Sequence, residues 1–468
     1  MQTELPGYSY TILENRNAIG GTWDLFRYPG IRSDSDLHTF GFSWRPWSKS
    51  TAIADGESIR NYVRESAEQY GIDRKIQFQH KLQSADWSSD EQQWTLSVDN
   101  NGEQKTYIAR FMILSTGYYD YSQPLKADIP GIDNFKGTVI HPQFWPEDLD
   151  YAGKRMVIIG SGATAITLLP NLVDKAAQVT MLQRSPSYII ALPAVDPLGN
   201  FVRKWFPTSV ARTLVRWKFL VLPLIFFKFC RAFPNAARTM LSKGTQKVLP
   251  ASSGIALEPN FKPKYNPWEQ RLCICPDGDF FKALQRNNAD IVTDTIENVT
   301  ATGIKTSSGN TIETDIIITA TGLKMQLAGG AAISVDGVKV NPADKFVWKS
   351  VMIQDIPNAC LVIGYTNASW TLGADATALL VCRLIKHMQK NSQSSAVPRV
   401  SEKGMQRKPL LNLNSTYIEK AKGALPSAGD VAPWKARDNY MTDFWVANNG
   451  SVTKDMEFTK IPEKAKAL

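Results

Sequence analysis

Short apolar runs alternate with helical patterns along most of the chain. Residues 155–159 form a β-branched run, residues 163–173 follow with a helical apolar pattern, and residues 178–182 form a second apolar run. This strand–helix–strand order is typical of parallel sheets. Elsewhere, residues 94–98 and 106–114 flank an Asp-Asn-Asn-Gly turn, which predicts a β-hairpin. The pattern therefore predicts an α/β protein.

The turn after the first central strand carries a Gly-Ser-Gly-Ala-Thr-Ala sequence at residues 160–165. Gly160 permits the tight turn, Gly162 lets the backbone approach a pyrophosphate, and the small Ala165 lets helix and strand pack closely. The N-terminus of the following helix offers N–H groups to the anion. In this context the turn predicts dinucleotide binding rather than a chance glycine turn. The predicted binding residues are Gly160, Gly162, Ala163 and Thr164.

The residues that end the second central strand select the cofactor. An NAD site usually has an acidic residue there, but this chain has Gln183 and Arg184. A guanidinium can make bidentate hydrogen bonds to a 2′-phosphate, so Arg184 favours NADPH. The competing interpretation is an ordinary solvated arginine.

A second nucleotide-binding unit is represented only by its later part. Residues 10–13 have the pattern of a strand, Glu14 occupies the position of a ribose-binding acid, and a Gly-Gly-Thr-Trp loop follows at residues 20–23. The glycine loop of such a unit belongs about 20 residues before the acid, but only residues 1–13 precede Glu14, and Gly7 is the sole glycine among them. We therefore expect the first strand, phosphate loop and first helix of this domain to be missing, through a misassigned start, a truncated gene or a fragment.

Composition narrows the function classes. The chain has 468 residues, of which 43% are hydrophobic and 21% charged, which fits a large folded protein of two domains. Five cysteines are too few and too oddly numbered for a disulfide framework, so a reducing cytosol is expected. Four histidines without a Cys/His cluster predict no metal site. The net charge of +9 comes from scattered cations, which favours a solvated basic surface and no nucleic-acid partner.

Membrane contact is the open question about location. The N-terminus lacks the pattern of a secretory signal, and the most apolar stretch, residues 219–227, is too short to span a bilayer. Residues 203–238 are expected to form a helical insertion that shapes the substrate cavity or rests on a membrane surface. Because basic residues interrupt the apolar faces, burial against the protein is the favoured interpretation. We expect a cytoplasmic protein, with membrane association as the alternative.

Longer motifs are distributed along most of the chain. They lie at residues 10–36, 135–146, 265–273, 315–322 and 364–372. The second has the form F-x-G-x-x-x-H-x-x-x-W-P, and its defining residues are Phe135, Gly137, His141 and Trp145. Together these motifs resemble those of the Baeyer–Villiger monooxygenases, which are class B flavoprotein monooxygenases, and most closely the ethionamide-activating subgroup.

The resemblance implies two dinucleotide-binding, Rossmann-like domains of the FAD/NAD(P)-dependent flavoprotein type. We place the first part of a FAD-binding domain at residues 1–146 and its second part at residues 323–445. An NADPH-binding domain at residues 147–322, with a helical insertion at about 195–260, lies between them, and residues 446–468 form a tail.

The resemblance also implies the reaction. NADPH reduces the flavin, and the reduced flavin takes up O₂ to give a C4a-peroxyflavin, which inserts oxygen beside a ketone carbonyl or oxidises a soft sulfur group. A permanently cationic guanidinium would stabilise the anionic states of this reaction. By resemblance, Arg271 is that catalytic arginine and Asp34 orients it. Many family members have lysine before this arginine, but Gln270 stands here, which leaves more of the phosphate recognition to Arg184.

The remaining implied site residues bind or couple the cofactors. For His141 and Trp145 we favour coupling of the two domains over proton transfer, with an ordinary packed pair as the plain alternative. An ordinary ion pair is likewise the plain alternative for Arg271. The implied flavin-binding residues are Glu14, Gly21, Thr22, Trp23, Asp34 and Asn367.

Two other functions stay open from the sequence. One is an N- or S-oxidising flavin-containing monooxygenase, which would not depend on the arginine. The other is an inactive remnant that binds NADPH but has lost the FAD phosphate loop.

Overall fold

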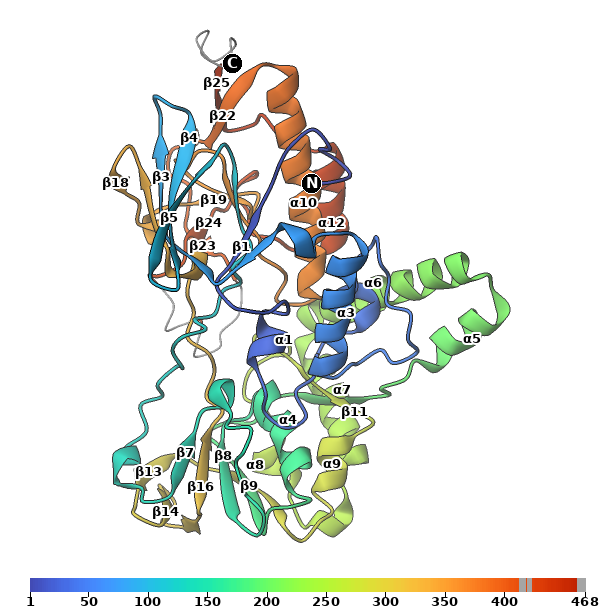
Figure 1. Cartoon of the computed structure of the whole chain (residues 1–468). Helices are drawn as coiled ribbons and strands as arrows, with labels where there is room; N and C mark the ends of the chain where they lie inside the picture. Colours follow the sequence, from blue (N-terminus) through green and yellow to red (C-terminus); the bar gives the residue numbers. More distant parts are fainter. Residues whose placement is uncertain (412–417, 419–422, 461–468) are drawn as a thin grey trace.

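A five-stranded parallel sheet forms the centre of one half of the molecule, which we call the parallel-sheet half (Figure 1). The computed structural model describes residues 1–411, 418 and 423–460. The strand order is β12-β9-β8-β16-β7. Its strands are β7 (Thr138–Ile140), β8 (Arg155–Ile159), β9 (Gln178–Gln183), β12 (Ala289–Thr293) and β16 (Ile316–Thr319).

Both faces of this sheet are covered, which explains its uninterrupted apolar strands. Along β16, Ile316 and Ile318 belong to one core cluster and Ile317 to another. Helices pack on the first face and a small antiparallel sheet on the second. These elements are α4 (Ala163–Leu172), α9 (Asp279–Ala283), β13 (Ile296–Val299), β14 (Gly303–Thr306) and β15 (Thr311–Glu313).

The other half, which we call the split-sheet half, contains two separate parallel strand pairs, β1–β2 and β21–β6. A five-stranded sheet of order β18-β17-β3-β4-β5 packs against the second pair. The predicted hairpin is confirmed over β4 and β5, but its second strand ends at Ala109, and residues 112–114 form β6, which pairs with β21. The strands are β1 (Ile12–Glu14), β2 (Ile76–Phe78), β3 (His80–Ser88), β4 (Gln93–Asn100), β5 (Glu103–Ala109), β6 (Met112–Leu114), β17 (Ala332–Val335), β18 (Val338–Lys339) and β21 (Ala359–Leu361).

Helix α10 (Trp370–Lys390) covers the other side of β21. Its Ala376, Leu380 and Leu384 recur four residues apart and are buried in one cluster with Cys360 of β21. The remaining elements of this half are α1 (Thr22–Leu25), α2 (Leu37–Phe40), α3 (Gly56–Gln69), α12 (Tyr440–Asn449), β19 (Val347–Trp348), β20 (Met352–Ile353), β22 (Gln393–Pro398), β23 (Lys408–Pro409), β24 (Ser427–Ala428) and β25 (Met456–Lys460).

Four helices interrupt the parallel-sheet half. They are α5 (Pro197–Trp205), α6 (Thr208–Ala232), α7 (Pro234–Val248) and α8 (Leu257–Asn260), with the parallel pair β10 (Ile189–Leu192) and β11 (Cys273–Pro276) on either side. Helix α5 and the start of α6 form a hairpin that projects from the body (Figure 1). Within the described residues, no helix is both long and apolar enough to cross a membrane.

Short 3-10 turns complete the description: η1 (Asp73–Lys75), η2 (Ile132–Asn134), η3 (Pro142–Phe144), η4 (Ala251–Ser253), η5 (Ala328–Gly330) and η6 (Pro342–Asp344). Strand β7 precedes residue 146 in sequence but belongs to the central parallel sheet. The domain limits given from the sequence stay predictions, and residues 461–468 of the predicted tail lie outside the described residues.

Candidate cofactor and catalytic site

The Gly-x-Gly turn joins β8 to α4 as its sequence predicts. Gly160 has φ +139°, and a Cβ there would lie 2.3 Å from the carbonyl oxygen of Ala320, so only glycine fits. Gly162 is the N-cap of α4, and a Cβ there would meet nothing within 4 Å. The turn is therefore packed tightly on the sheet side and open on the side where the helix N–H groups point.

Ser161 links this turn to the end of β9. Its hydroxyl donates to the Ser185 carbonyl over 2.8 Å. Arg184, at the same strand end, is exposed, whereas Gln183 is buried and donates its amide to Asn260 and Thr293 at 2.8 Å each. Of the two residues that stand in place of an acid, only Arg184 is therefore positioned to contact a ligand.

Glu14 and the Gly20–Gly21 turn lie together in the split-sheet half. Glu14 ends β1 and accepts a hydrogen bond from the backbone N–H of Arg16 over 2.8 Å, and burial raises the pKa of its carboxyl. Gly20 and Gly21 both have positive φ, +136° and +52°, so the turn depends on glycine.

Side-chain contacts fix the helix that follows this turn. The Thr22 hydroxyl lies 2.8 Å from that of Tyr121, and the Trp23 ring packs edge-on against Phe40 at 5.9 Å between centroids. Three of the implied flavin-binding residues, Gly21, Thr22 and Trp23, thus belong to one ordered loop and helix start.

Arg271 and Asp34 meet although 237 residues separate them. The Arg271 Nη2 lies 3.4 Å from Asp34 Oδ1, and the two side chains are 36% and 27% exposed. Arg271 precedes β11 of the parallel-sheet half, and Asp34 precedes α2 of the split-sheet half. The pair therefore bridges the junction of the two halves and still contacts solvent.

Two further contacts hold the Asp34 segment against the parallel-sheet half. Arg32 forms an ion pair with Asp279 at the start of α9, with a second contact of 3.3 Å. Tyr28 is buried and hydrogen-bonded to Thr164 of α4, and burial raises its pKa to about 12. Neither contact is evident from sequence, because the partners are distant and only the intervening fold brings them together.

The F-x-G-x-x-x-H-x-x-x-W motif lies beside the same junction. A Cβ on Gly137 would lie 2.4 Å from the Asp315 carbonyl oxygen and 2.6 Å from the Phe135 ring, so the motif requires glycine there. Phe135 and Trp145 are buried in the two clusters that cover the parallel sheet.

His141 connects strand ends rather than forming a helical pair with Trp145. Its Nε2 lies 3.2 Å from the Gly322 carbonyl oxygen, and its Nδ1 accepts from the Gln143 backbone N–H over 3.2 Å. Burial lowers the pKa of the ring. Because Nδ1 accepts a hydrogen bond, the proton of the neutral ring is on Nε2, which donates to Gly322. Trp145 follows a 3-10 turn, η3.

The loop before α10 carries Asn367, whose Nδ2 donates to the Asp438 carbonyl over 3.3 Å. The Ser369 hydroxyl lies 2.7 Å from that of Thr39, and the Thr371 hydroxyl donates to the Phe40 carbonyl over 2.6 Å. These bonds join the loop to α2, directly after Asp34.

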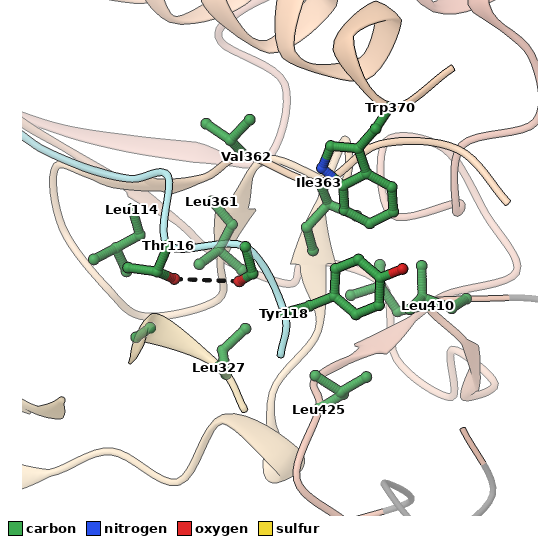
Figure 2. Close-up of a pocket in the computed structure, with 13 residues that line it drawn as sticks. Leu114, Thr116, Tyr118, Leu327, Leu361, Val362, Ile363, Trp370, Leu410 and Leu425 are labelled. Carbon is green, nitrogen blue, oxygen red and sulfur yellow. Dashed lines mark hydrogen bonds between the residues drawn. The ribbon is translucent and has the colours of Figure 1, made fainter. Parts of the chain in front are cut away.

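An apolar pocket lies on the other side of this loop (Figure 2). Tyr118 stacks on Trp370 there, with ring centroids 4.5 Å apart. Leucine side chains form much of the wall, among them Leu114 of β6 and Leu361 of β21. Arg271 and Asp34 are not among the lining residues, so this pocket is distinct from the ion pair at the junction.

The described residues fit one dinucleotide cradle in full and part of another. A Gly-x-Gly turn occurs once in the described chain, at Gly160 and Gly162, where the open helix N-terminus suits the pyrophosphate of NADPH. On the flavin side, Glu14 at the end of β1 suits the ribose of FAD, and the Gly21–Thr22 turn lies nearby.

Sequence comparisons place the chain among flavin enzymes. The "Flavin-binding monooxygenase-like" family model matches residues 49–202. The chain is 46% identical over 462 residues to the FAD-containing monooxygenase EthA of Mycolicibacterium smegmatis, covering 98% of the chain and 94% of that protein. It is 42% identical over 441 residues to the probable FAD-binding monooxygenase AlmA of Acinetobacter sp, covering 94% and 88%.

Solved structures show the same fold. A steroid monooxygenase bound to NADP matches with a TM-score of 0.73 at 19% identity, covering 98% of this chain and 96% of that one. A cyclohexanone-bound cyclohexanone monooxygenase matches with a TM-score of 0.74 at 20% identity, with the same coverage. The predicted α/β flavoprotein fold class is confirmed.

Proposed function

The chain belongs to the FAD-containing monooxygenases of the flavin-binding family, and on that premise we propose that it inserts oxygen beside a ketone carbonyl. It is a flavin-dependent enzyme that uses NADPH, with FAD and NADP as its cofactors. The proposed substrate is a small ketone, or a molecule with a soft sulfur group, and the co-substrate is O₂. The product of a ketone would be an ester or a lactone.

The Arg271–Asp34 pair is the observation that carries the proposal. When bound, the flavin supplies the oxygen-transfer chemistry, and NADPH supplies the hydride. A ketone carbonyl oxygen gains negative charge when its carbon is attacked. The Arg271 guanidinium, partly exposed and held 3.4 Å from Asp34, can stabilise that charge without losing its proton.

Asp34 has a positioning role in this proposal. It holds the guanidinium from the split-sheet half while the Arg271 backbone belongs to the parallel-sheet half. The ion pair between Arg32 and Asp279 fastens the same segment two residues away. The guanidinium is therefore held where the two cofactor-binding halves meet, as a group that acts on a substrate bound between them requires.

The NADPH-binding residues would orient the nicotinamide toward this junction. Gly162 and the N-terminus of α4 would hold the pyrophosphate, and Arg184 the 2′-phosphate. Tyr28, buried against Thr164 of α4, ties the N-terminal part of that helix to the Asp34 segment. His141 follows β7 and contacts the Gly322 carbonyl oxygen after β16. This contact supports a role in coupling the two halves rather than in proton transfer.

A substrate panel tests the proposal. The purified chain, supplied with FAD and NADPH, is offered cyclohexanone, a methyl aryl thioether and a tertiary amine in separate reactions, and products are identified by mass spectrometry. The expected result is a lactone from the ketone, with or without sulfoxide. An N-oxide without any lactone would overturn the proposal and favour the N-oxidising class. NADPH binding without oxygenation of any substrate would favour the inactive remnant.

A further inference from the structure

The arm formed by α5 and α6 exposes an unusual number of large apolar side chains. On α5, Leu198, Phe201 and Trp205 are 54%, 58% and 67% exposed. Their spacing of three and four residues puts them on one side of the helix. The sequence favoured burial of residues 203–238 against the protein, and Trp205, the one of these three side chains in that range, is instead exposed.

Helix α6 continues the same pattern. Val210, Leu214, Trp217 and Ile225 lie on one side at intervals of three or four residues or their multiples, and each is at least 43% exposed. Ala211 and Val215, on the neighbouring side of the helix, are buried, and α6 packs against α5, α2 and α7. The helix is therefore apolar on two sides, of which only one has a protein partner within the described residues.

The charged residues of this segment are all basic. Residues 197–257 contain ten lysines and arginines and no aspartate or glutamate. The other 43 basic residues of the 53 in the chain meet 44 acidic ones, so the rest of the chain carries a formal charge of −1. The net positive charge of the chain therefore comes from the helical segment. This corrects the expectation from sequence that the cations are scattered over the whole chain.

Some of these cations anchor the arm, and others are exposed on it. Arg216 donates to the carbonyl oxygens of His38 and Gly41 at 2.8 and 3.0 Å, which fixes α6 against α2. Lys204, Arg212 and Lys228 are exposed on the same two helices, and Lys228 shares the outward side of α6 with Ile225, three residues before it. An outward face with Trp, Phe and Leu side chains and interspersed cations is the composition of helices that lie in a membrane interface.

The root of the arm borders the candidate catalytic pair. On one side α6 contacts α2, which begins three residues after Asp34. On the other, the Phe227 ring packs edge-on against Trp268, three residues before Arg271, at 5.5 Å between centroids. A surface that binds the arm would therefore lie near the site of oxygen insertion.

We propose that the outward face of α5 and α6 docks on an anionic lipid bilayer, from which the enzyme takes an apolar ketone dissolved in the membrane. The choice of ketone rests on the proposed function, whereas the docking surface does not. Charge decides between a bilayer and a second copy of the chain. A symmetric dimer through this face would bring two acid-free cationic surfaces together, but anionic headgroups complement it at a gain of roughly 5-fold in affinity per cation.

Vesicle co-sedimentation tests the docking surface directly. The full chain, with FAD and NADP added, is mixed with vesicles of phosphatidylcholine alone or of phosphatidylcholine with the anionic lipid phosphatidylglycerol. Binding to the anionic vesicles and at least about 10-fold weaker binding to the neutral ones is expected. Equal affinity for both, or no binding to either, would overturn the proposal.

Two sets of variants locate the surface. Replacing Phe201, Trp205 and Ile225 together by glutamine should weaken anionic-vesicle binding by at least about 10-fold, because it removes apolar surface that the bilayer would bury. The fold should be kept, because exposed side chains contribute little to folding. The matched control replaces Ile108, Val338 and Trp445, which are similarly exposed elsewhere at 56%, 71% and 62%, and should bind as the unchanged chain does. Equal loss in both triple variants would overturn the assignment of the surface to the arm.

The exposed cations provide a second set. Replacing Lys204, Arg212 and Lys228 by glutamine should reduce binding to anionic vesicles and leave binding to neutral ones unchanged. The control replaces Lys339, Lys390 and Lys403, which are exposed in the split-sheet half, and should have little effect. A change in molar mass in solution, seen by light scattering and abolished only by the arm variants, would show that the occupant is a second copy and overturn the proposal.

Activity measurements separate this proposal from the proposed function. The apolar arm variant should oxidise cyclohexanone in solution at the rate of the unchanged chain, and its apparent KM for a long-chain ketone in anionic vesicles should rise at least about 5-fold. An equal loss with both ketones would contradict a role in delivery. Vesicle binding without any ketone oxidation would leave the docking surface standing and refute ketone oxygenation.

Discussion

The two halves of the molecule hold their ligand-binding residues in different ways. In the parallel-sheet half, the turn of Gly160 and Gly162, the start of α4 and Arg184 all belong to one strand–helix–strand unit around a continuous five-stranded sheet. In the split-sheet half, Glu14, Asp34 and Asn367 come from three separate segments. Side-chain contacts join the Asp34 segment to Arg271 and, through Thr39 and Ser369, to the loop of Asn367. The nucleotide-binding site of the parallel-sheet half depends on a few backbone positions in one unit. The site of the split-sheet half depends on contacts between segments that are distant in sequence.

The ion pair that spans the halves should give the largest effect. Replacing Arg271 by alanine removes the only charge we assign to the carbonyl oxygen, so kcat for cyclohexanone should fall by roughly 100- to 1,000-fold. Oxidation of NADPH should continue, because hydride transfer does not use this guanidinium in our account. The measurement is lactone formed per NADPH consumed.

A matched arginine controls for the loss of an ion pair as such. Arg155 lies at the start of β8, paired with Asp315 at 3.0 Å and 45% exposed. Its replacement by alanine should leave lactone formation nearly unchanged. Near-normal turnover of the Arg271 variant would refute the assigned role.

The nucleotide-binding site of the parallel-sheet half can be tested through cofactor choice. Replacing Arg184 by aspartate should raise KM for NADPH by roughly 10- to 150-fold, through loss of charged hydrogen bonds to the 2′-phosphate. KM for NADH should change little, because NADH lacks that phosphate. The control is Lys154→Asp, because Lys154 precedes β8 and so lies at the edge of the parallel sheet opposite to Arg184, which follows β9. Equal changes for both nucleotides in the Arg184 variant would rule out phosphate recognition by this residue.

Substitutions of the two glycines in the turn should affect different properties, stability for Gly160 and NADPH binding for Gly162. Gly160→Ala places a methyl group against the Ala320 carbonyl and should lower the free energy of unfolding by about 2 kcal/mol or more. Gly162→Ala meets open space and should change it by less than about 0.5 kcal/mol, while KM for NADPH rises. Urea unfolding and steady-state kinetics separate the two. Similar loss of stability in both variants would contradict the packing described.

The smallest effect should come from His141 at the junction. Burial lowers the pKa of this ring, so the folded chain keeps it neutral while the unfolded chain gains a proton near pH 6.5. Its contribution to stability is therefore present above pH 6.5 and declines as the pH falls below that value. Urea unfolding at pH 7.5 and 5.5 should show a smaller acid-induced loss in His141→Gln. An unchanged loss would assign the acid sensitivity to other groups.

Sequence reasoning works best where structure is local. The turn at residues 160–165, the hairpin of β4 and β5, and Arg184 at a strand end follow from spacing and residue type alone. Arg271 and Asp34 were paired only through family resemblance, since 237 residues separate them and nothing in their spacing indicates contact.

Other features could not be predicted because they depend on tertiary packing. The hydrogen bond of Tyr28 to Thr164 and the ion pair of Arg32 with Asp279 exist only because the two halves meet. The outward side of α6 was misjudged for a similar reason. Apolar residues occur on both sides of that helix, and sequence alone does not show which side has a protein partner.

Isotope labelling shows whether the oxygen inserted beside the carbonyl comes from O₂. The purified chain with FAD, NADPH and cyclohexanone is supplied with ¹⁸O₂, and the lactone is analysed by mass spectrometry. We expect one ¹⁸O atom in the ring position of the lactone and loss of this product in Arg271→Ala. Consumption of NADPH with unchanged ketone, or labelled lactone formed equally well without Arg271, would contradict it.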